Sequence, residues 1–222
     1  MQFTFTIVAK QASRPAVQKR SRETRDELIN ALERLLRRSD FQDLNVQDLA
    51  DEAGVSPGAI YRRFDGGLIA VLFALWHTTL ERRTVSEEAR VDFRKARSLR
   101  SALRRAAQIA WDQLRQDAHI YRAAYLHARL HPDVKRRSAA AMEKANVAGF
   151  RALLDAFPRE AKRRDLERAA EATAYLYNTA FVERALFPER LPAWARSIGD
   201  AAFVEQVAEF AYSYLATSDA AA

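Results

Sequence analysis

Residues 45–64 narrow the possible folds of this chain more than any other segment, because they predict two short helices joined by a tight turn. Asn45 can cap the first helix, since its side chain can accept a hydrogen bond from a backbone N–H two or three residues later. Gly54 occupies the turn, where a residue without Cβ enters the left-handed region at little cost. We expect Ser56 to cap the second helix, and Pro57 suits its first turn, where a missing N–H removes no hydrogen bond.

The second of these helices divides into a core face and an outward face. Ile60 and Phe64 are four residues apart and are expected to face the core. The residues left to the outside combine small size with positive charge: Gly58, Ala59, Tyr61, Arg62 and Arg63. A helix that enters the major groove of DNA needs both properties. An ordinary helical hairpin is the alternative, but an amphipathic helix over residues 22–38 would complete a three-helix domain, which favours DNA binding.

The stretch from about Arg22 to Leu75 resembles the N-terminal domain of TetR-type (tetracycline-repressor-like) transcriptional regulators. The residues that carry the resemblance are Phe41, Leu44, Val46, Leu49, Ala50, Ala53, Gly54, Val55, Ser56, Ile60, Tyr61, Arg62, Arg63 and Phe64. The resemblance implies a homodimeric, all-helical regulator whose third helix reads DNA and whose variable C-terminal domain binds an effector. The residues that it places nearest the base edges are Pro57, Gly58, Ala59 and Arg62, and those that it places at phosphates are Ser56, Tyr61 and Arg63. We include Asn45 among the DNA-binding residues.

The chain departs from this family's pattern at two points. Position 63 is commonly histidine or another aromatic residue in the family, whereas this chain has Arg63. The family usually has a lysine in the linker that follows, and this lysine touches phosphate. Here the linker is Asp65-Gly66-Gly67, without a lysine. The docking geometry at this edge therefore cannot be carried over from the family.

Composition sets the broad class of the protein. The chain has 222 residues, 49% of them apolar, which is enough for a substantial core in one or two domains. No apolar run approaches the roughly 18 residues that span a membrane, and the opening residues do not have the pattern of a secretory signal. The absence of cysteine excludes disulfides and thiolate zinc sites and fits a cytoplasmic protein.

Positive charge is concentrated in two segments of a chain whose net charge is +7. Residues 1–25 hold six basic residues and one acid, so we predict a flexible basic arm over residues 1–21 that follows the DNA backbone, or else a solvated tail. A second run, Arg82 to Arg105, has nine basic residues and three acids, and we interpret it as a solvated face.

The rest of the chain shows only helical periodicity, so the fold class is all-α. We predict a helix-turn-helix domain over residues 22–66 and a helical effector-binding and dimerisation domain over residues 67–222. The predicted helices of that domain are residues 67–91, 98–116, 118–130, 133–157, 165–187 and 201–217. Prolines lie near their ends, as expected.

The last two predicted helices indicate a dimer interface. The helix from Leu166 to Phe187 is apolar or small almost all round beyond Arg168, and such a helix must be covered on every side. The final helix contributes further aromatic and aliphatic residues. Together they predict half of a four-helix interface in a homodimer, with burial inside a single large bundle as the alternative.

The sequence offers weaker signals for an effector site. Aromatic residues and two amides that we expect to be buried form our candidate ligand-binding set: Trp111, Tyr121, Tyr125, Asn146, Phe150 and Asn178. Ordinary core packing is the alternative for each. His127 and His131 are four apart but lack the pattern of a metal site, so we expect no metal and no cofactor. Without a catalytic motif, we also expect no enzymatic activity.

These patterns together predict a sequence-specific DNA-binding transcriptional regulator, a ligand-responsive repressor that binds a palindromic operator in double-stranded DNA as a homodimer. The alternatives are a DNA-binding architectural or protein-partner-gated protein without a small-molecule effector, and a helical enzyme in which the hairpin is incidental.

Overall fold

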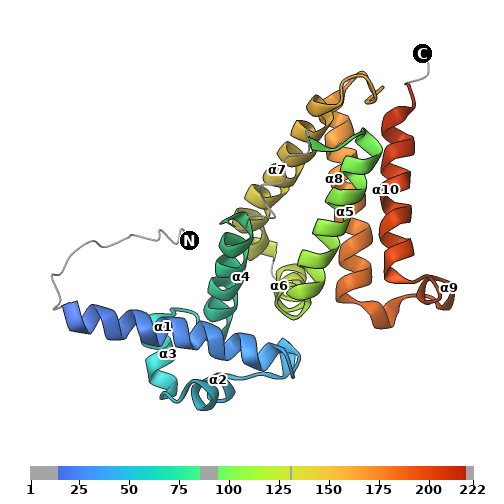
Figure 1. The fold of residues 1–222 in the computed structure, drawn as a ribbon. Helices are drawn as coiled ribbons and strands as arrows, with labels where there is room; N and C mark the ends of the chain where they lie inside the picture. The colour runs from blue at the N-terminus through green and yellow to red at the C-terminus, as the bar shows by residue number, and fades with distance from the viewer. Residues whose placement is uncertain (1–14, 86–94, 131, 219–222) are drawn as a thin grey trace. The chain divides into compact units, whose positions relative to one another are not determined.

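The computed structural model describes residues 15–85, 95–130 and 132–218, and these described residues are helical with short connections and no strand (Figure 1). The chain divides into two compact units, Met1–Leu75 and Trp76–Ala222. The division lies inside α4 (Leu68–Val85), so the linker at residues 65–67 does not separate the units. The predicted all-α fold class is confirmed. No helix in the described part of the chain is both long enough and apolar enough to span a bilayer.

The first unit packs three helices and the start of a fourth around a leucine-rich core. Its elements are α1 (Pro15–Leu36), the 3-10 helix η1 (Phe41–Asp43), α2 (Val46–Ala53), α3 (Pro57–Arg63) and the first turns of α4. The fully buried side chains come from every α-helix and include Leu28, Leu32, Leu49, Ile60 and Leu72. Because these residues recur at helical spacing, each helix presents one apolar face to a shared core.

The first helix begins earlier than we predicted. We expected it to start at residue 22, at the end of a basic arm, but α1 begins at Pro15. Proline suits the first turn of a helix, because its missing N–H has no partner there. Residues 1–14 of the predicted arm lie outside the described residues.

The second unit is a bundle in which α5 (Leu99–Gln116), α7 (Pro132–Ala156), α8 (Leu166–Leu186) and α10 (Asp200–Ala216) are its longest helices (Figure 1). The shorter α6 (Ala118–Leu130) leads into α7. The 3-10 helix η4 (Pro188–Arg190) and α9 (Ala193–Arg196) connect α8 to α10. The predicted helix borders of α5 to α8 and α10 are right to within one residue, whereas η4 and α9 were not predicted.

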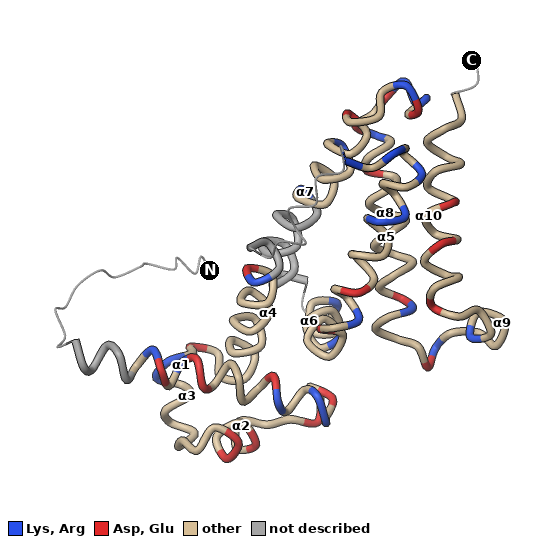
Figure 2. The backbone as a smooth tube through the Cα atoms, in the orientation of Figure 1, with Lys and Arg blue, Asp and Glu red and all other residues tan. Residues whose placement is uncertain are grey.

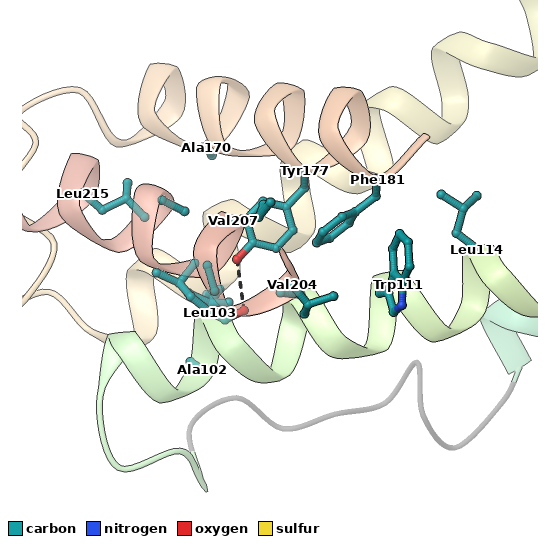
Figure 3. Packing of buried hydrophobic residues seen from close by; sticks show 14 of the residues in the cluster. Ala102, Leu103, Trp111, Leu114, Ala170, Tyr177, Phe181, Val204, Val207 and Leu215 are labelled. Carbon is teal, nitrogen blue, oxygen red and sulfur yellow. Dashed lines mark hydrogen bonds between the residues drawn. The ribbon is translucent and has the colours of Figure 1, made fainter. Parts of the chain in front are cut away.

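Aromatic rings fill the centre of this bundle (Figure 3). Trp111 of α5 makes edge contacts with Phe181 and Phe203, at centroid distances of 5.8 and 6.0 Å. The ring centroids of Tyr177 and Phe181 are 5.3 Å apart, and the Tyr177 hydroxyl donates to Leu103 O at 3.0 Å. Desolvation of this hydroxyl raises the pKa of Tyr177 above its ordinary value. The hydrogen bond to Leu103 O satisfies the Tyr177 hydroxyl inside the cluster.

The part of the second basic run on α5 lies on an exposed face, as we interpreted it, and Arg100 and Arg104 form surface ion pairs with α10. Arg100 lies 3.2 Å from Glu209, and Arg104 pairs with both Glu205 and Glu209. The guanidinium of Arg100 also lies 4.5 Å from the centroid of the Tyr212 ring. These cations therefore join α5 to α10 instead of facing bulk water alone. Residues 86–94 of the run lie outside the described residues.

Candidate nucleic-acid interface

The turn between α2 and α3 is built from the residues that the sequence indicated. Asn45 Oδ1 accepts hydrogen bonds from Gln47 N at 2.8 Å and Asp48 N at 3.1 Å, and Asp48 Oδ2 accepts from Asn45 N at 2.7 Å. This reciprocal capping box satisfies N–H groups at the start of α2. Gly54 ends α2 in the left-handed region, at φ 65° and ψ 35°.

The predicted cap of α3 is wrong in one respect. Ser56 stands at the N-cap position, but its side chain makes no capping hydrogen bond, and it is its backbone carbonyl that accepts from Ala59 N at 2.8 Å. Pro57 occupies the first turn as expected. Ser56 is exposed and its hydroxyl does not cap the helix. A phosphate could therefore reach this hydroxyl, and the contact itself remains a prediction.

The faces of α3 follow the prediction except at Ala59. Ile60 and Phe64 are buried in the first unit, as expected, and Tyr61, Arg62 and Gly58 are exposed. Ala59, which we placed near the base edges, is 7% exposed and buried with Ile60. In so short a helix the buried arc includes the residue next to Ile60, so Ala59 presents little surface to a partner.

Arg62 is the most accessible cation of α3. A Cβ built on Gly58 would lie 3.4 Å from Arg62 Nη1, so the guanidinium lies along the exposed side of the helix, over Gly58. The small residue and the cation thus share one outward surface, as base reading at close approach requires.

Arg63 has a different environment. Its Nη1 donates to Ala59 O at 3.2 Å, and its Nε is buried without a hydrogen-bond partner among the described residues. The side chain therefore folds back on α3 and supports the last turn of this helix. A phosphate contact by Arg63 remains a prediction, and it would have to use guanidinium N–H groups that do not bond to Ala59 O.

Arg34 near the end of α1 and Arg38 in the turn that follows it both bind Glu52 of α2. Figure 2 shows acidic residues on α2 and charged residues of both signs along α1. Arg34 Nε donates to Glu52 Oε1 at 2.7 Å, and Arg38 donates to the other carboxylate oxygen of Glu52. Arg34 also donates to Glu27 at 2.8 Å. Hydrogen bonds from Arg34 and then Arg38 lower the pKa of Glu52, because they favour its charged form. These two arginines thus serve to fix the first helix of the turn.

The four aromatic residues of the candidate ligand set all lie in or against the core of the bundle. Trp111 and Phe150 both reach the aromatic centre, because Phe150 packs 4.9 Å from the ring of Tyr177. Tyr121 and Tyr125 are half-buried and pack against the same core, with the ring centroid of Tyr125 5.8 Å from that of Phe187. The sequence argument overlooked Tyr177, although aromatic residues at helical spacing on α8 could have indicated it.

The premise that two amides are buried is wrong. Asn146 on α7 and Asn178 on α8 are both exposed in this chain. Each lies on the side of its helix that faces away from the core, so neither amide needs a ligand to satisfy it. Their contact with a ligand remains an untested prediction. His127 is half-buried and His131 lies outside the described residues, and no group of three potential metal ligands occurs in the described part.

Comparison with known proteins agrees with this geometry. Residues 28–66 match the sequence model of the bacterial regulatory proteins of the tetR family. A search of curated proteins found no match.

Solved structures similar to the chain share its fold over most of its length. A protein from Rhodococcus sp. assigned to the TetR-family transcriptional regulators is 20% identical, with a TM-score of 0.61, over 88% of this chain and 100% of that one. The multidrug binding protein EbrR complexed with imidazole is 20% identical, with a TM-score of 0.61, over 97% and 100%. The fatty acid degradation regulator FadR from Bacillus halodurans is 18% identical, with a TM-score of 0.62, over 92% and 98%. Residues 28–66 therefore match the DNA-binding domain of the tetR family, and the chain as a whole shares the fold of solved structures assigned to that family.

Proposed function

We propose that the protein is a sequence-specific DNA-binding regulator that acts as a homodimer and represses transcription until a small molecule releases it. The observation that carries DNA binding is the outward surface of α3, where Tyr61 is 57% exposed and the guanidinium of Arg62 lies over Gly58. The capping box of α2 supports the helix that precedes this surface. Small residues and cations on a rigid helix suit the major groove and its phosphates.

A second copy of the chain is the proposed partner of the bundle. Tyr175 of α8 is 72% exposed, and Phe210 and Tyr214 of α10 are 66% and 36% exposed. Since Phe181 contacts Phe203, and Arg184 contacts Asp200, α8 and α10 are antiparallel and Tyr175 and Phe210 lie at nearly the same level. Exposed aromatic residues grouped on two adjacent helices are typical of interaction surfaces. A two-fold axis would let both copies use this surface.

The proposed effector is an apolar or aromatic small molecule that enters the ring cluster around Trp111, Tyr177 and Phe181. Two similar structures point to this class: one is of a multidrug binding protein complexed with imidazole and the other of a fatty acid degradation regulator. An effector needs only a higher affinity for one arrangement of the dimer. Since successive major grooves are about 34 Å apart, a modest change in the spacing of the two DNA-binding units would prevent simultaneous docking.

Selection of duplexes from a random-sequence pool tests the DNA-binding part of the proposal. The wild-type protein should enrich a palindromic sequence, and Arg62→Ala should enrich it less strongly. If the wild-type protein retains no sequence above the background of the pool, sequence-specific DNA binding is refuted.

The dimer is tested by placing a charge on the proposed surface. Tyr175→Glu and Phe210→Glu should sediment as monomers, because each would bury an unpaired carboxylate in an apolar contact. The matched control is Trp194→Glu, since Trp194 is equally exposed, at 72%, but lies on α9 outside the surface. If both surface variants sediment as tight dimers, the dimer interface does not lie on this surface. Ala174 and Ala211 are unsuitable for this test, because they are buried within the chain's own bundle.

A further inference from the structure

Two consecutive glycines form the junction between α3 and α4, at the point where the chain lacks the lysine typical of its family. Gly66 and Gly67 have φ values of 111° and 61°, both in the region that favours glycine. Gly67 N donates to Phe64 O at 3.0 Å, and Gly67 O accepts from Val71 N at 3.2 Å. Gly67 therefore belongs to the end of one helix and the start of the next.

The ring of Tyr61 occupies the space that a side chain at Gly67 would need. A Cβ built on Gly67 would lie 3.0 Å from Tyr61 Cε1, 3.5 Å from Cζ and 3.6 Å from the hydroxyl oxygen. Carbon atoms in favourable contact are about 3.5–4.0 Å apart, so such a Cβ would push the ring away. The other glycines of this unit that have positive φ differ: Gly54 has open space around its missing Cβ, and Gly66 would meet only Ala70, at 3.5 Å.

We propose that Gly67 is a positioning residue for DNA binding, because its missing Cβ lets the Tyr61 ring rest on the turn and directs the hydroxyl to the α3–α4 junction. An exposed tyrosine without such a support would lose rotamer freedom on binding. With the ring already in place, the hydroxyl can donate to a DNA phosphate at a lower entropic cost. The inference rests on the proposed DNA binding by α3.

The test compares asparagine at two glycine positions. Asparagine tolerates the left-handed region better than most residues, so Gly67→Asn adds a Cβ at little backbone strain. Gly54→Asn is the matched control, because Gly54 has a φ of 65° but no atom within 4 Å of its missing Cβ. Both substitutions are also made in a Tyr61→Ala background, and Tyr61→Phe removes the hydroxyl alone.

The probe is a fluorescent duplex selected by the wild-type protein from a random-sequence pool, titrated at several salt concentrations. Gly67→Asn and Tyr61→Phe should each weaken binding by at least about tenfold, the lower limit for losing one hydrogen bond to a charged group. Gly54→Asn should leave the affinity unchanged. In the Tyr61→Ala background, Gly67→Asn should cause no further loss, because the residue through which it acts is gone.

Two results would overturn the inference while leaving the proposed function intact: equal losses from Gly67→Asn with and without Tyr61, or full affinity in Tyr61→Phe. Failure of the wild-type protein to bind any duplex would refute the proposed function itself. One measurement needs no folded variant: nuclear Overhauser contacts between the Tyr61 ring and the Gly67 α-protons are expected in the wild-type protein. If these contacts are missing, the ring does not rest on the turn.

Discussion

Arg184 is the buried cation that we expect to contribute most to the stability of the bundle. Its side chain is 8% exposed, and its Nε and Nη2 donate to Asp200 Oδ1 at 3.1 and 3.0 Å. Nη1 donates to Ala195 O at 3.0 Å, and Nη2 also donates to Ile198 O. The guanidinium lies 4.6 Å from the centroid of the Phe203 ring. One side chain thus ties α8 to the connection that leads into α10.

Arg184→Met keeps an unbranched chain but removes every donor. The two backbone carbonyls would lose their partners, at about 1–3 kcal/mol each when buried and less where water can replace the donor. The contact with the Phe203 ring contributes roughly 0.5–1 kcal/mol more. Removing a buried charge offsets part of this loss. Asp200 keeps Arg115 at 2.7 Å, so its carboxylate is not left unpaired. We therefore expect the free energy of unfolding to fall by about 2–4 kcal/mol.

Arg115→Met is the matched control, because Arg115 binds the same carboxylate but its side chain is 57% exposed. An exposed pair contributes about 0.2–1 kcal/mol, so this variant should remain close to the wild-type protein. Urea unfolding followed by circular dichroism and by tryptophan emission gives both differences. Equal losses in the two variants, or a loss below about 1 kcal/mol for Arg184→Met, would refute the reasoning. The carbonyls before α10 would then be satisfied in another way.

Three further predictions follow from the first unit. Because hydrogen bonds from arginines lower the pKa of Glu52 in the folded state, the stability that it adds is present above its unfolded pKa and is lost as the pH falls through the folded value. Thermal unfolding between neutral and acidic pH should therefore be less pH-dependent in Glu52→Gln, and an unchanged dependence would contradict this. Arg62→Ala should reduce discrimination between selected and random duplexes by about 1–3 kcal/mol, whereas Arg63→Ala should weaken binding to all duplexes alike. If Arg62→Ala weakens binding to every sequence equally, Arg62 does not read the bases. Deleting residues 1–14, which hold two basic residues, should leave the fold intact and lower the salt dependence of DNA binding, and unchanged binding at low salt would exclude a role for this segment.

The sequence by itself determined the features that depend on near neighbours in the chain. Asn45 caps α2 and Gly54 ends it, because the geometry of a helix end depends on a few consecutive residues. The borders of the longer helices after α4 were predictable for the same reason, since helical periodicity and prolines are local signals. The core face of α3 through Ile60 and Phe64 follows from their four-residue spacing.

The tertiary structure decided which polar groups are buried and which partners they have. Arg184 is on a helix that we interpreted as apolar or small almost all round, and only the chain from Ala195 to Asp200 supplies the carbonyls and carboxylate that make its burial tolerable. Asn178, in contrast, was expected to be buried and is exposed, because the periodicity of an alanine-rich helix does not identify its covered side.

The candidate interface shows the same division. Sequence alone identified Tyr61, Arg62 and Arg63 as an outward set, since their positions on α3 follow from helical spacing. It did not show that Arg63 folds back onto Ala59 O or that the Tyr61 ring rests on Gly67. Side-chain direction depends on the space that neighbouring elements leave open, and here the start of α4 limits that space. For this physical reason, the residues of the site were predictable from the sequence, whereas their orientation was decided only by the fold.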